Sequence, residues 1–208
     1  MLTTAKVGVG YWGIDLAEGC RGDIIEGNTI TDIGAGGIKV DGANYPSDPA
    51  KYSGRNCITD NVIKSGGRVF QSAAGIAITH GFSNLIAHNE ISDMGQSGIA
   101  CGWEWSRDTQ VSRDNRIEKN HIFKLGQKMS SDMGGVYVLG VQPGTMVRNN
   151  LIHDVQHRSY GGWGIYTDSR TAHVVVEPTS ATSSSQTASP STTRTPARPP
   201  SVRGTISS

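Results

Sequence analysis

Short runs of alternating aliphatic and polar residues recur along the chain at a nearly constant spacing. Each unit has a β-branched aliphatic residue, two further residues, an asparagine, one residue and an isoleucine. A glycine followed by a second aliphatic residue comes 9 to 15 residues after each asparagine. The asparagines are 33, 28, 31 and 30 residues apart, at Asn28, Asn61, Asn89, Asn120 and Asn150. Such a period is typical of a solenoid, a propeller or an array.

Each unit predicts two or three short β-strands separated by polar, glycine-rich corners. Ile38-Lys39-Val40 and Ile76-Ala77-Ile78 show the period-2 alternation of strands, and no segment has an amphipathic helical stripe. One unit has too few apolar residues to bury a face alone, so it must stack on its neighbours. The pattern therefore predicts an all-β fold, a right-handed parallel β-helix like that of pectate lyases, with about five to six coils. One interior stack is expected to consist of Ile25, Ile58, Ile86, Ile117 and Val147.

The recurring asparagine and glycine are expected to be structural. Asparagine amides at one corner can bond the coils above and below, and asparagine tolerates left-handed backbone angles. A glycine suits a tight corner that enters the next strand. A propeller blade would need a longer period with antiparallel hairpins, and leucine-rich repeats would need abundant leucine. Both alternatives are disfavoured. The glycine–aliphatic pairs are Gly37-Ile38, Gly75-Ile76, Gly98-Ile99, Gly135-Val136 and Gly164-Ile165.

The repeat is incomplete at both ends. Gly13-Ile14 fills the glycine–aliphatic position of a unit whose asparagine half is missing, and no polar cap precedes it. At the other end, Val175 suggests a further asparagine at position 178, where proline stands. Residues 178–208 include 9 Ser, 7 Thr and 5 Pro. We therefore expect residues 1–177 to be a β-helix fragment without end caps and 178–208 to be disordered, as a linker or a frameshifted segment.

Composition and charge exclude several functional classes. The formal net charge is +1, and no basic cluster alternates with aromatic residues, so no nucleic-acid partner is expected. No window is apolar enough for a membrane span, and the first residues lack the layout of a signal peptide. Cys20, Cys57 and Cys101 lack metal-binding spacing and are interpreted as free thiols. We expect no cofactor, no metal and a monomeric protein.

Residues whose side chains could bind a substrate or take part in catalysis lie where one set of strands ends. The positions four to six residues past the repeat glycine are Asp41, His80, Trp103 with Glu104, Leu139 and Asp168. Aromatic residues accompany this polar column: Trp103, Trp105, Tyr137, Trp163 and Tyr166. Sugars stack on aromatic rings while carboxylates bond their hydroxyls, so the mixture indicates a carbohydrate cleft. The predicted substrate-binding residues are His80, Trp103, Tyr137, Trp163 and Tyr166.

Two stretches of the chain carry a family resemblance. Residues 132–155, which begin Asp132-Met133-Gly134-Gly135-Val136-Tyr137, and residues 160–168, which end Gly164-Ile165-Tyr166-Thr167-Asp168, resemble the β-helix glycoside hydrolases of family 141. That family includes fucosidases and xylanases. The resemblance extends over residues 11–177. It implies a secreted or periplasmic enzyme that acts on plant-type polysaccharides with two aspartates, which match Asp132 and Asp168 in this sequence.

Spacing leaves the second carboxylate open. If both coils ran straight, Asp132 and Asp168 would lie roughly 23 Å apart, because seven residues of strand separate their positions. Two-carboxylate glycosidases need about 5–9.5 Å. The pair therefore requires the loop between Leu125 and Gly134 to curl back. Glu104 is the rival partner, at about 10 Å from Asp168 by stacking. The candidate catalytic residues are Asp168, Asp132 and Glu104.

Three functions are compatible with the sequence. Glycoside hydrolysis is the first. The second is a polysaccharide lyase or uronate epimerase, which a β-helix can also support. The third is a non-catalytic carbohydrate-binding solenoid, which would include an inactive fragment of an enzyme. In each case the expected partner is a polysaccharide or oligosaccharide.

Overall fold

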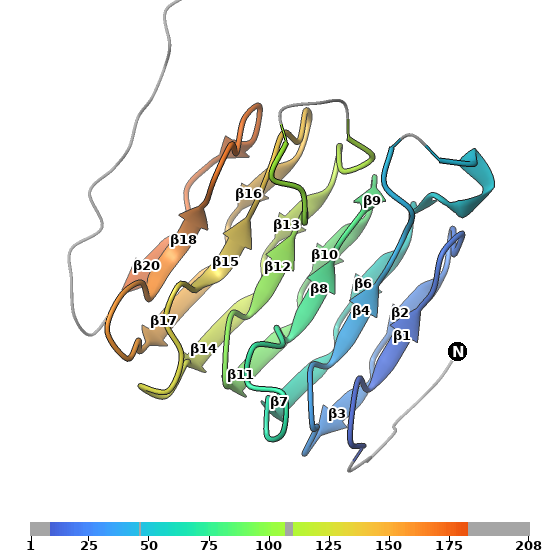
Figure 1. Ribbon diagram of the computed structural model, residues 1–208. Coiled ribbons are helices and arrows are strands. Elements are labelled where there is room, and N and C mark those ends of the chain that lie inside the picture. Colours follow the sequence, from blue (N-terminus) through green and yellow to red (C-terminus); the bar gives the residue numbers. More distant parts are fainter. Residues whose placement is uncertain (1–8, 46, 107–109, 183–208) are drawn as a thin grey trace, which may run out of the picture.

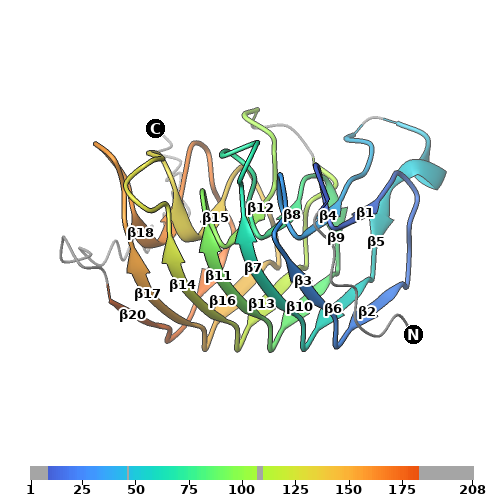
Figure 2. The ribbon, with the colours of Figure 1, turned by 90° about the horizontal axis from the view of Figure 1, so that it is seen from below.

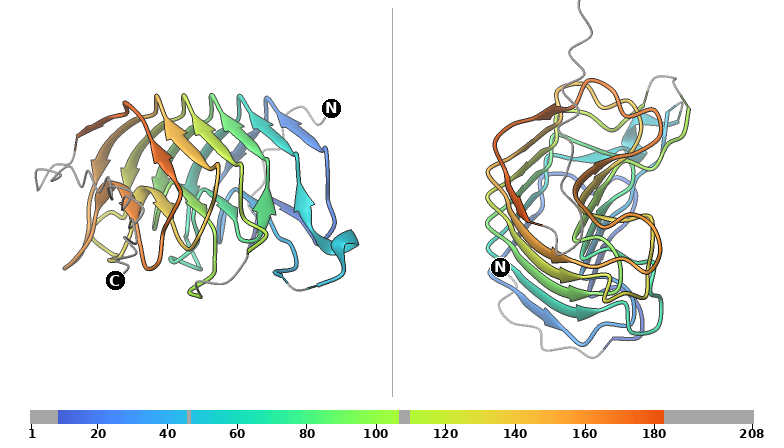
Figure 3. Two further views of the ribbon diagram at one scale, coloured as in Figure 1. Left: turned by 90° about the horizontal axis from the view of Figure 1, so that it is seen from above. Right: turned by 90° about the vertical axis from the view of Figure 1, so that its left-hand side faces the viewer.

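The protein is a solenoid in which the chain winds through successive coils (Figure 1). The computed structural model of the protein describes residues 9–45, 47–106 and 110–182. Each coil contributes strands to three sheets, and every strand pairing in these sheets is parallel. Figure 2 follows the coils from β2 near the N-terminal end to β20 at the other end, and Figure 3 shows them from two further sides.

The first sheet bears the candidate site and has six strands. They are β1 (Ile14–Leu16), β4 (Ile38–Val40), β8 (Ile76–Ile78), β12 (Ile99–Cys101), β15 (Gly134–Val138) and β18 (Trp163–Thr167). The repeat glycine enters each of these strands, or lies within the longer ones, as the sequence predicted.

The second and third sheets also have six strands each. The second comprises β2 (Ile24–Glu26), β6 (Cys57–Thr59), β10 (Leu85–Ala87), β13 (Arg116–Glu118), β16 (Met146–Arg148) and β19 (Val175–Val176). The third comprises β3 (Thr29–Thr31), β7 (Val62–Gly66), β11 (Glu90–Met94), β14 (His121–Leu125), β17 (Leu151–Val155) and β20 (Ser180–Thr182). A short pair, β5 (Ser53–Gly54) with β9 (Gly81–Phe82), and the 3₁₀ turn η1 (Pro49–Lys51) complete the structure.

Aliphatic side chains fill the interior in columns that run from coil to coil. The predicted stack is confirmed, because its members pair in register across the second sheet and all are buried: Ile25, Ile58, Ile86, Ile117 and Val147. A second column, of Ile38, Ile76, Ile99 and Val136, lines the inner face of the first sheet. One continuous core thus joins all coils, which is what single units could not form alone.

The asparagine ladder is also confirmed. Each amide Nδ2 donates to the Oδ1 of the asparagine in the next coil, over 2.9 to 3.0 Å, from Asn28 through Asn61, Asn89 and Asn120 to Asn150. The expectation that these asparagines adopt left-handed angles is wrong. The left-handed residue is the one before each asparagine, such as Asp60 (φ 57°) and Lys119 (φ 58°). A second, shorter ladder of Asn56, Asn84 and Asn115 was not predicted.

Regular structure extends past the predicted boundary at residue 177. Val176, not Val175, pairs with Val147, and β20 pairs with β17. In this register Thr179 stands where the next asparagine would, and its Oγ1 accepts the backbone N–H of Asn150 over 3.5 Å. The threonine replaces part of the amide's role, so residues 178–182 continue the coil instead of being unpaired. The expectations for residues 183–208 and 1–8 lie outside the described residues.

Candidate active site

The outer face of the first sheet has a floor of small side chains between two polar ends. Its outward residues pair in register from Asp15 and Lys39 through Ala77 and Ala100 to Tyr137 and Tyr166. The two alanines leave space above the central strands β8 and β12. The two tyrosines begin a group of polar side chains on β15 and β18.

Asp168 lies directly after β18, and its backbone N–H donates to the carbonyl of Val138 over 2.9 Å. Its carboxylate accepts hydrogen bonds from the hydroxyls of Tyr137, Tyr166 and Ser169. Burial raises the pKa of Asp168, but hydrogen bonds from Tyr137, the Ser169 backbone and Tyr166 outweigh burial and hold this pKa below its ordinary value. Asp168 is therefore ionised at neutral pH.

Asp132 reaches the same place from the loop between β14 and β15. Its backbone is left-handed (φ 58°), and its N–H donates to the carbonyl of Tyr160 over 3.0 Å. The neighbouring loop allows this approach because Gly161 has no side chain, and a Cβ there would lie 2.8 Å from the Asp132 nitrogen. Met133, next in the chain, is fully buried and anchors the loop. The loop thus curls back toward the end of the strand.

The hydroxyl of Tyr166 joins the two aspartates. It lies 2.9 Å from Asp132 Oδ1 and 3.0 Å from Asp168 Oδ1. Because one oxygen contacts both, the two carboxylate oxygens lie within about 6 Å of each other, close to the separation in two-carboxylate glycosidases. The structure brings these two predicted residues together.

The surrounding tyrosines act as donors. Burial, followed by the hydrogen bond to Asp168, raises the pKa of Tyr137 above its ordinary value. Burial and the contacts with Tyr160, Asp132 and Asp168 raise the pKa of Tyr166. Both phenols therefore keep their protons at neutral pH. A hydroxyl has a single proton, so Tyr166 satisfies both carboxyl contacts only when one carboxyl itself carries a proton.

Glu104 lies in a different set of contacts. Its carboxylate accepts from Asn44 Nδ2 and from the backbone N–H of Ser106, the latter over 2.9 Å. The hydrogen bonds described for Glu104 thus stabilise the loop that follows β12 and do not reach Asp132 or Asp168. This geometry does not support Glu104, in place of Asp132, as the second catalytic carboxylate.

The predicted polar column is interrupted. In register with Asp41 and Asp168 stand Thr79, Gly102 and Leu139, and Leu139 is fully buried. His80, Trp103 and Glu104 follow this position by one or two residues. His80 is half-buried and is not part of the groove described below. The register position lies four residues past each repeat glycine, whereas residues five and six past it belong to the turn that follows, and counting all three positions together combined the two.

The aromatic residues form a continuous series along the site. Ring centroids lie 5.5 Å apart for Trp103–Trp105, 5.1 Å for Tyr137–Tyr166 and 4.2 Å for Trp163–Tyr166. Trp103 also contacts Tyr137, at 6.3 Å between centroids. Four of the five predicted substrate-binding residues are thus gathered around the aspartate pair, and His80 is the exception.

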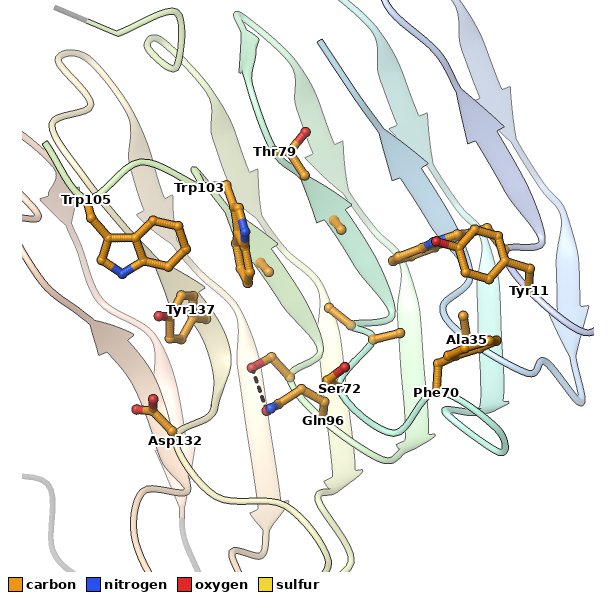
Figure 4. Close-up of a pocket in the computed structure, with 16 residues that line it drawn as sticks. Tyr11, Ala35, Phe70, Ser72, Thr79, Gln96, Trp103, Trp105, Asp132 and Tyr137 are labelled. Atoms are coloured by element: carbon orange, nitrogen blue, oxygen red, sulfur yellow. Dashed lines mark hydrogen bonds between the residues drawn. The ribbon is translucent and has the colours of Figure 1, made fainter. Parts of the chain in front are cut away.

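A groove of about 510 Å³ extends from Asp132 across the first sheet (Figure 4). We call it the aromatic groove; its lining is Tyr11, Trp12, Ala35, Phe70, Ser72, Ala73, Ala74, Ala77, Thr79, Gln96, Ser97, Ala100, Trp103, Trp105, Asp132 and Tyr137. Sequence reasoning missed Tyr11, Trp12 and Phe70 at its far end. Trp12 precedes the repeat glycine of its coil, as Trp163 does in the last coil, and this correspondence was the available signal.

No metal centre or membrane span is found in the part of the chain that the structure describes. No three histidine, cysteine, aspartate or glutamate side chains there gather closely enough to hold a metal ion. The described residues also contain no helix with the length and apolar character needed to cross a membrane.

Comparisons with known proteins identify the fold. The family model for the right handed beta helix region matches residues 8–181, so the chain belongs to this family and the predicted fold class is confirmed. A solved structure named "Glycoside hydrolase" superposes with a TM-score of 0.68 and 23% sequence identity, over 82% of this chain. The chain spans about a third of that structure's length, since 34% of it is covered. Comparison with curated proteins gives no match.

Proposed function

We propose that this right-handed β-helix protein is a glycoside hydrolase with Asp132 and Asp168 as its two catalytic carboxyl groups. The observation that carries the proposal is the Tyr166 hydroxyl, which contacts both carboxyls. The aromatic rings beside the pair suit the stacking of sugars. The structural neighbour's name is in keeping with this activity, and the sequence resemblance to family 141 adds to it.

The separation favours a retaining mechanism. Retaining enzymes place their carboxyl groups about 5–5.5 Å apart, whereas inverting enzymes need about 6.5–9.5 Å to accommodate a water. Oxygens within about 6 Å of each other fit the shorter class better. In this mechanism the sugar is transferred first to the enzyme and then to water, with two inversions at the anomeric carbon.

The hydrogen bonds support a different role for each aspartate. Burial raises the pKa of Asp168, but its hydrogen bonds lower this pKa by more, so the carboxylate is ionised. We assign it as the nucleophile that attacks the anomeric carbon. Asp132 is the general acid, which gives a proton to the departing glycosidic oxygen. The first step thus forms an ester between the sugar and Asp168. In the second step Asp132 removes a proton from water, which attacks the anomeric carbon and releases Asp168.

The proposed substrate is a plant-type polysaccharide or an oligosaccharide derived from one. Plant-type polysaccharides occur outside the cytoplasm, so we propose a secreted or periplasmic site of action, in line with the family resemblance. We further propose that the protein works as a monomer, because both aspartates come from one chain and contact the same Tyr166 hydroxyl.

The test combines activity with separate probes for each role. The full chain is incubated with a panel of plant polysaccharides and aryl glycosides, and NMR records the anomer formed first. We expect hydrolysis with retention. Asp168→Gly should lose several orders of magnitude in turnover and recover with azide, yielding a glycosyl azide of inverted configuration. Asp132→Gly should lose most with poor leaving groups and least with activated aryl groups.

Three outcomes would contradict the proposal. Release of the inverted sugar would refute the retaining mechanism. Wild-type turnover by Asp168→Asn would remove this aspartate pair from consideration. An unsaturated product absorbing in the ultraviolet would instead identify a lyase.

A further inference from the structure

We propose that the aromatic groove binds an uncharged stretch of glycan that runs along the solenoid axis, with a remote sugar subsite formed by Tyr11 and Phe70. The inference rests on the proposed function, because it takes the aspartate pair as the reacting end of the groove. It adds the charge class of the substrate, its direction and a subsite on the first coils.

The far end of the groove holds an exposed aromatic pair. Tyr11 and Phe70 are 56% and 49% exposed, and their rings meet edge to face at 5.4 Å between centroids. They come from loops of different coils, 59 positions apart in the chain. Trp12 beside them is packed against a glycine, since a Cβ at Gly36 would lie 2.1 Å from the Trp12 ring. This support fixes the platform without covering its rings.

A matching pair stands at the near end. Trp103 and Trp105 are 46% and 49% exposed and also meet edge to face. Figure 4 shows these tryptophans with Tyr137 at one end of the groove, Tyr11 and Phe70 at the other, and small side chains between. Large apolar rings exposed at both ends of one groove mark a binding surface. Rings separated by a smooth floor suit a chain of pyranose faces.

The groove crosses the strands, so its length follows from strand spacing. Tyr11 precedes β1, and Tyr137 lies on β15, with β4, β8 and β12 between them. Four steps of about 4.8 Å give about 19 Å along the axis. A single sugar at the aspartate pair cannot reach Tyr11, whereas a chain of several sugars can.

Charge distinguishes the occupant. Among the described residues that line the groove, Asp132 is the one acidic side chain, it belongs to the reacting pair, and none of these lining residues is basic. Two described cations beside the groove, Lys39 next to Ala77 and Arg68 before Phe70, are already paired. Lys39 Nζ lies 2.7 Å from Asp41 and 3.9 Å from Asp15, and Arg68, two residues before Phe70, is paired with Asp93. A uronate carboxylate would find no cation among the described lining residues, so its desolvation there would be uncompensated. The groove therefore selects neutral sugars.

Binding by the full chain carrying Asp168→Asn tests the inference independently of hydrolysis. The probes are neutral hexasaccharides of xylose, glucose and mannose, the corresponding disaccharides, and hexagalacturonate, measured by calorimetry. At least one neutral hexasaccharide should bind more tightly than hexagalacturonate. The added pair Tyr11→Ala and Phe70→Ala should weaken hexasaccharide binding by about tenfold and leave the disaccharide unchanged.

The controls separate the ring contacts from effects on folding. Val69→Ala removes a neighbouring side chain that is 66% exposed and does not line the groove, and it should leave binding unchanged. Tyr11→Trp keeps a ring and should retain affinity. Failure of every neutral hexasaccharide to bind, stronger binding of hexagalacturonate, or unchanged binding by the double variant would overturn the inference. If Asp168→Asn proves fully active while these binding results hold, only the proposed function fails.

Discussion

Asp41 and Asp168 occupy the same position of the repeat at opposite ends of one sheet, yet their surroundings differ. Each directly follows its strand and donates its backbone N–H to a carbonyl of the preceding coil. Asp41 donates to Leu16 over 2.8 Å, and Asp168 donates to Val138 over 2.9 Å. Asp41 faces a cation, Lys39, and accepts a hydrogen bond from Thr79 over 2.7 Å. Asp168 faces tyrosine hydroxyls and a second carboxyl.

The difference shows that the repeat supplies positions and the neighbouring side chains supply chemistry. Lys39 neutralises Asp41, so its charge is used within the fold. Asp168 is stabilised by neutral donors, and its charge is left available for an electrophile. A carboxylate next to a second carboxyl and without a cation is typical of glycosidase sites.

The largest expected effect is a difference in turnover between variants of these two residues. Asp168→Asn removes the nucleophile and should reduce kcat by at least about a thousandfold. Asp41→Asn breaks an ion pair outside the reacting pair and should leave kcat within about twofold of wild type. Steady-state kinetics on the best substrate of the panel measures both. Equal losses in the two variants would mean that the comparison is wrong.

The second effect concerns the bridging hydroxyl. Tyr166→Phe removes a donor that lowers the pKa of Asp168, so this pKa should rise and the acidic limb of the rate profile should move to higher pH. We expect kcat/KM to fall by about a hundredfold. The profile of kcat/KM against pH is the measurement.

Tyr160→Phe is the matched control for that change. Tyr160 is exposed, and its hydroxyl reaches Tyr166, 3.1 Å away, so its removal should have a much smaller effect. A lower rate for Tyr166→Phe with an unmoved acidic limb would show that this hydroxyl does not tune Asp168.

The periodic parts of the molecule could be predicted from sequence because one contact repeats in every coil. The stack through Ile86 and the ladder through Asn89 follow from residues recurring at equivalent positions. Asp168 was identified in the same way, by counting from Gly164. Each prediction needed only the strand alternation and the spacing of the units.

The non-periodic parts could not be derived in this way. Asp132 reaches Tyr166 through its own left-handed backbone and a hydrogen bond to the carbonyl of Tyr160, and the spacing of the repeat predicts neither contact. Phe70 lies in the loop between β7 and β8, where the other coils show no aromatic residue at a matching position that spacing could identify. The run Val174-Val175-Val176 permits two registers, and pairing with β16 decides between them. Spacing alone therefore left both the second carboxylate and the far end of the groove unresolved.

The smallest effect should appear in the pH dependence of stability. Burial raises the pKa of Asp41, but the hydrogen bonds from Lys39 and Thr79 lower this pKa by a larger amount, so the net shift is downward. A lowered pKa in the folded state stabilises the protein above the unfolded pKa, near pH 4, and this contribution is lost as pH falls through the folded value. The pair is partly exposed, so Asp41→Asn should cost about 0.5 kcal/mol at pH 7.

Urea unfolding of the full chain at pH 7 and at pH 3 measures this cost. The difference between Asp41→Asn and wild type should shrink at the lower pH, because the carboxylate that forms the pair is then increasingly protonated. Glu18→Gln is the matched control, since Glu18 is more exposed and lies 3.6 Å from Lys51, and its effect should be smaller still. A difference that grows on acidification would contradict the ion-pair role of Asp41. The contrast with Asp168 would then lose its physical basis, because the ion pair with Lys39 would no longer explain why Asp41 takes no part in the reaction.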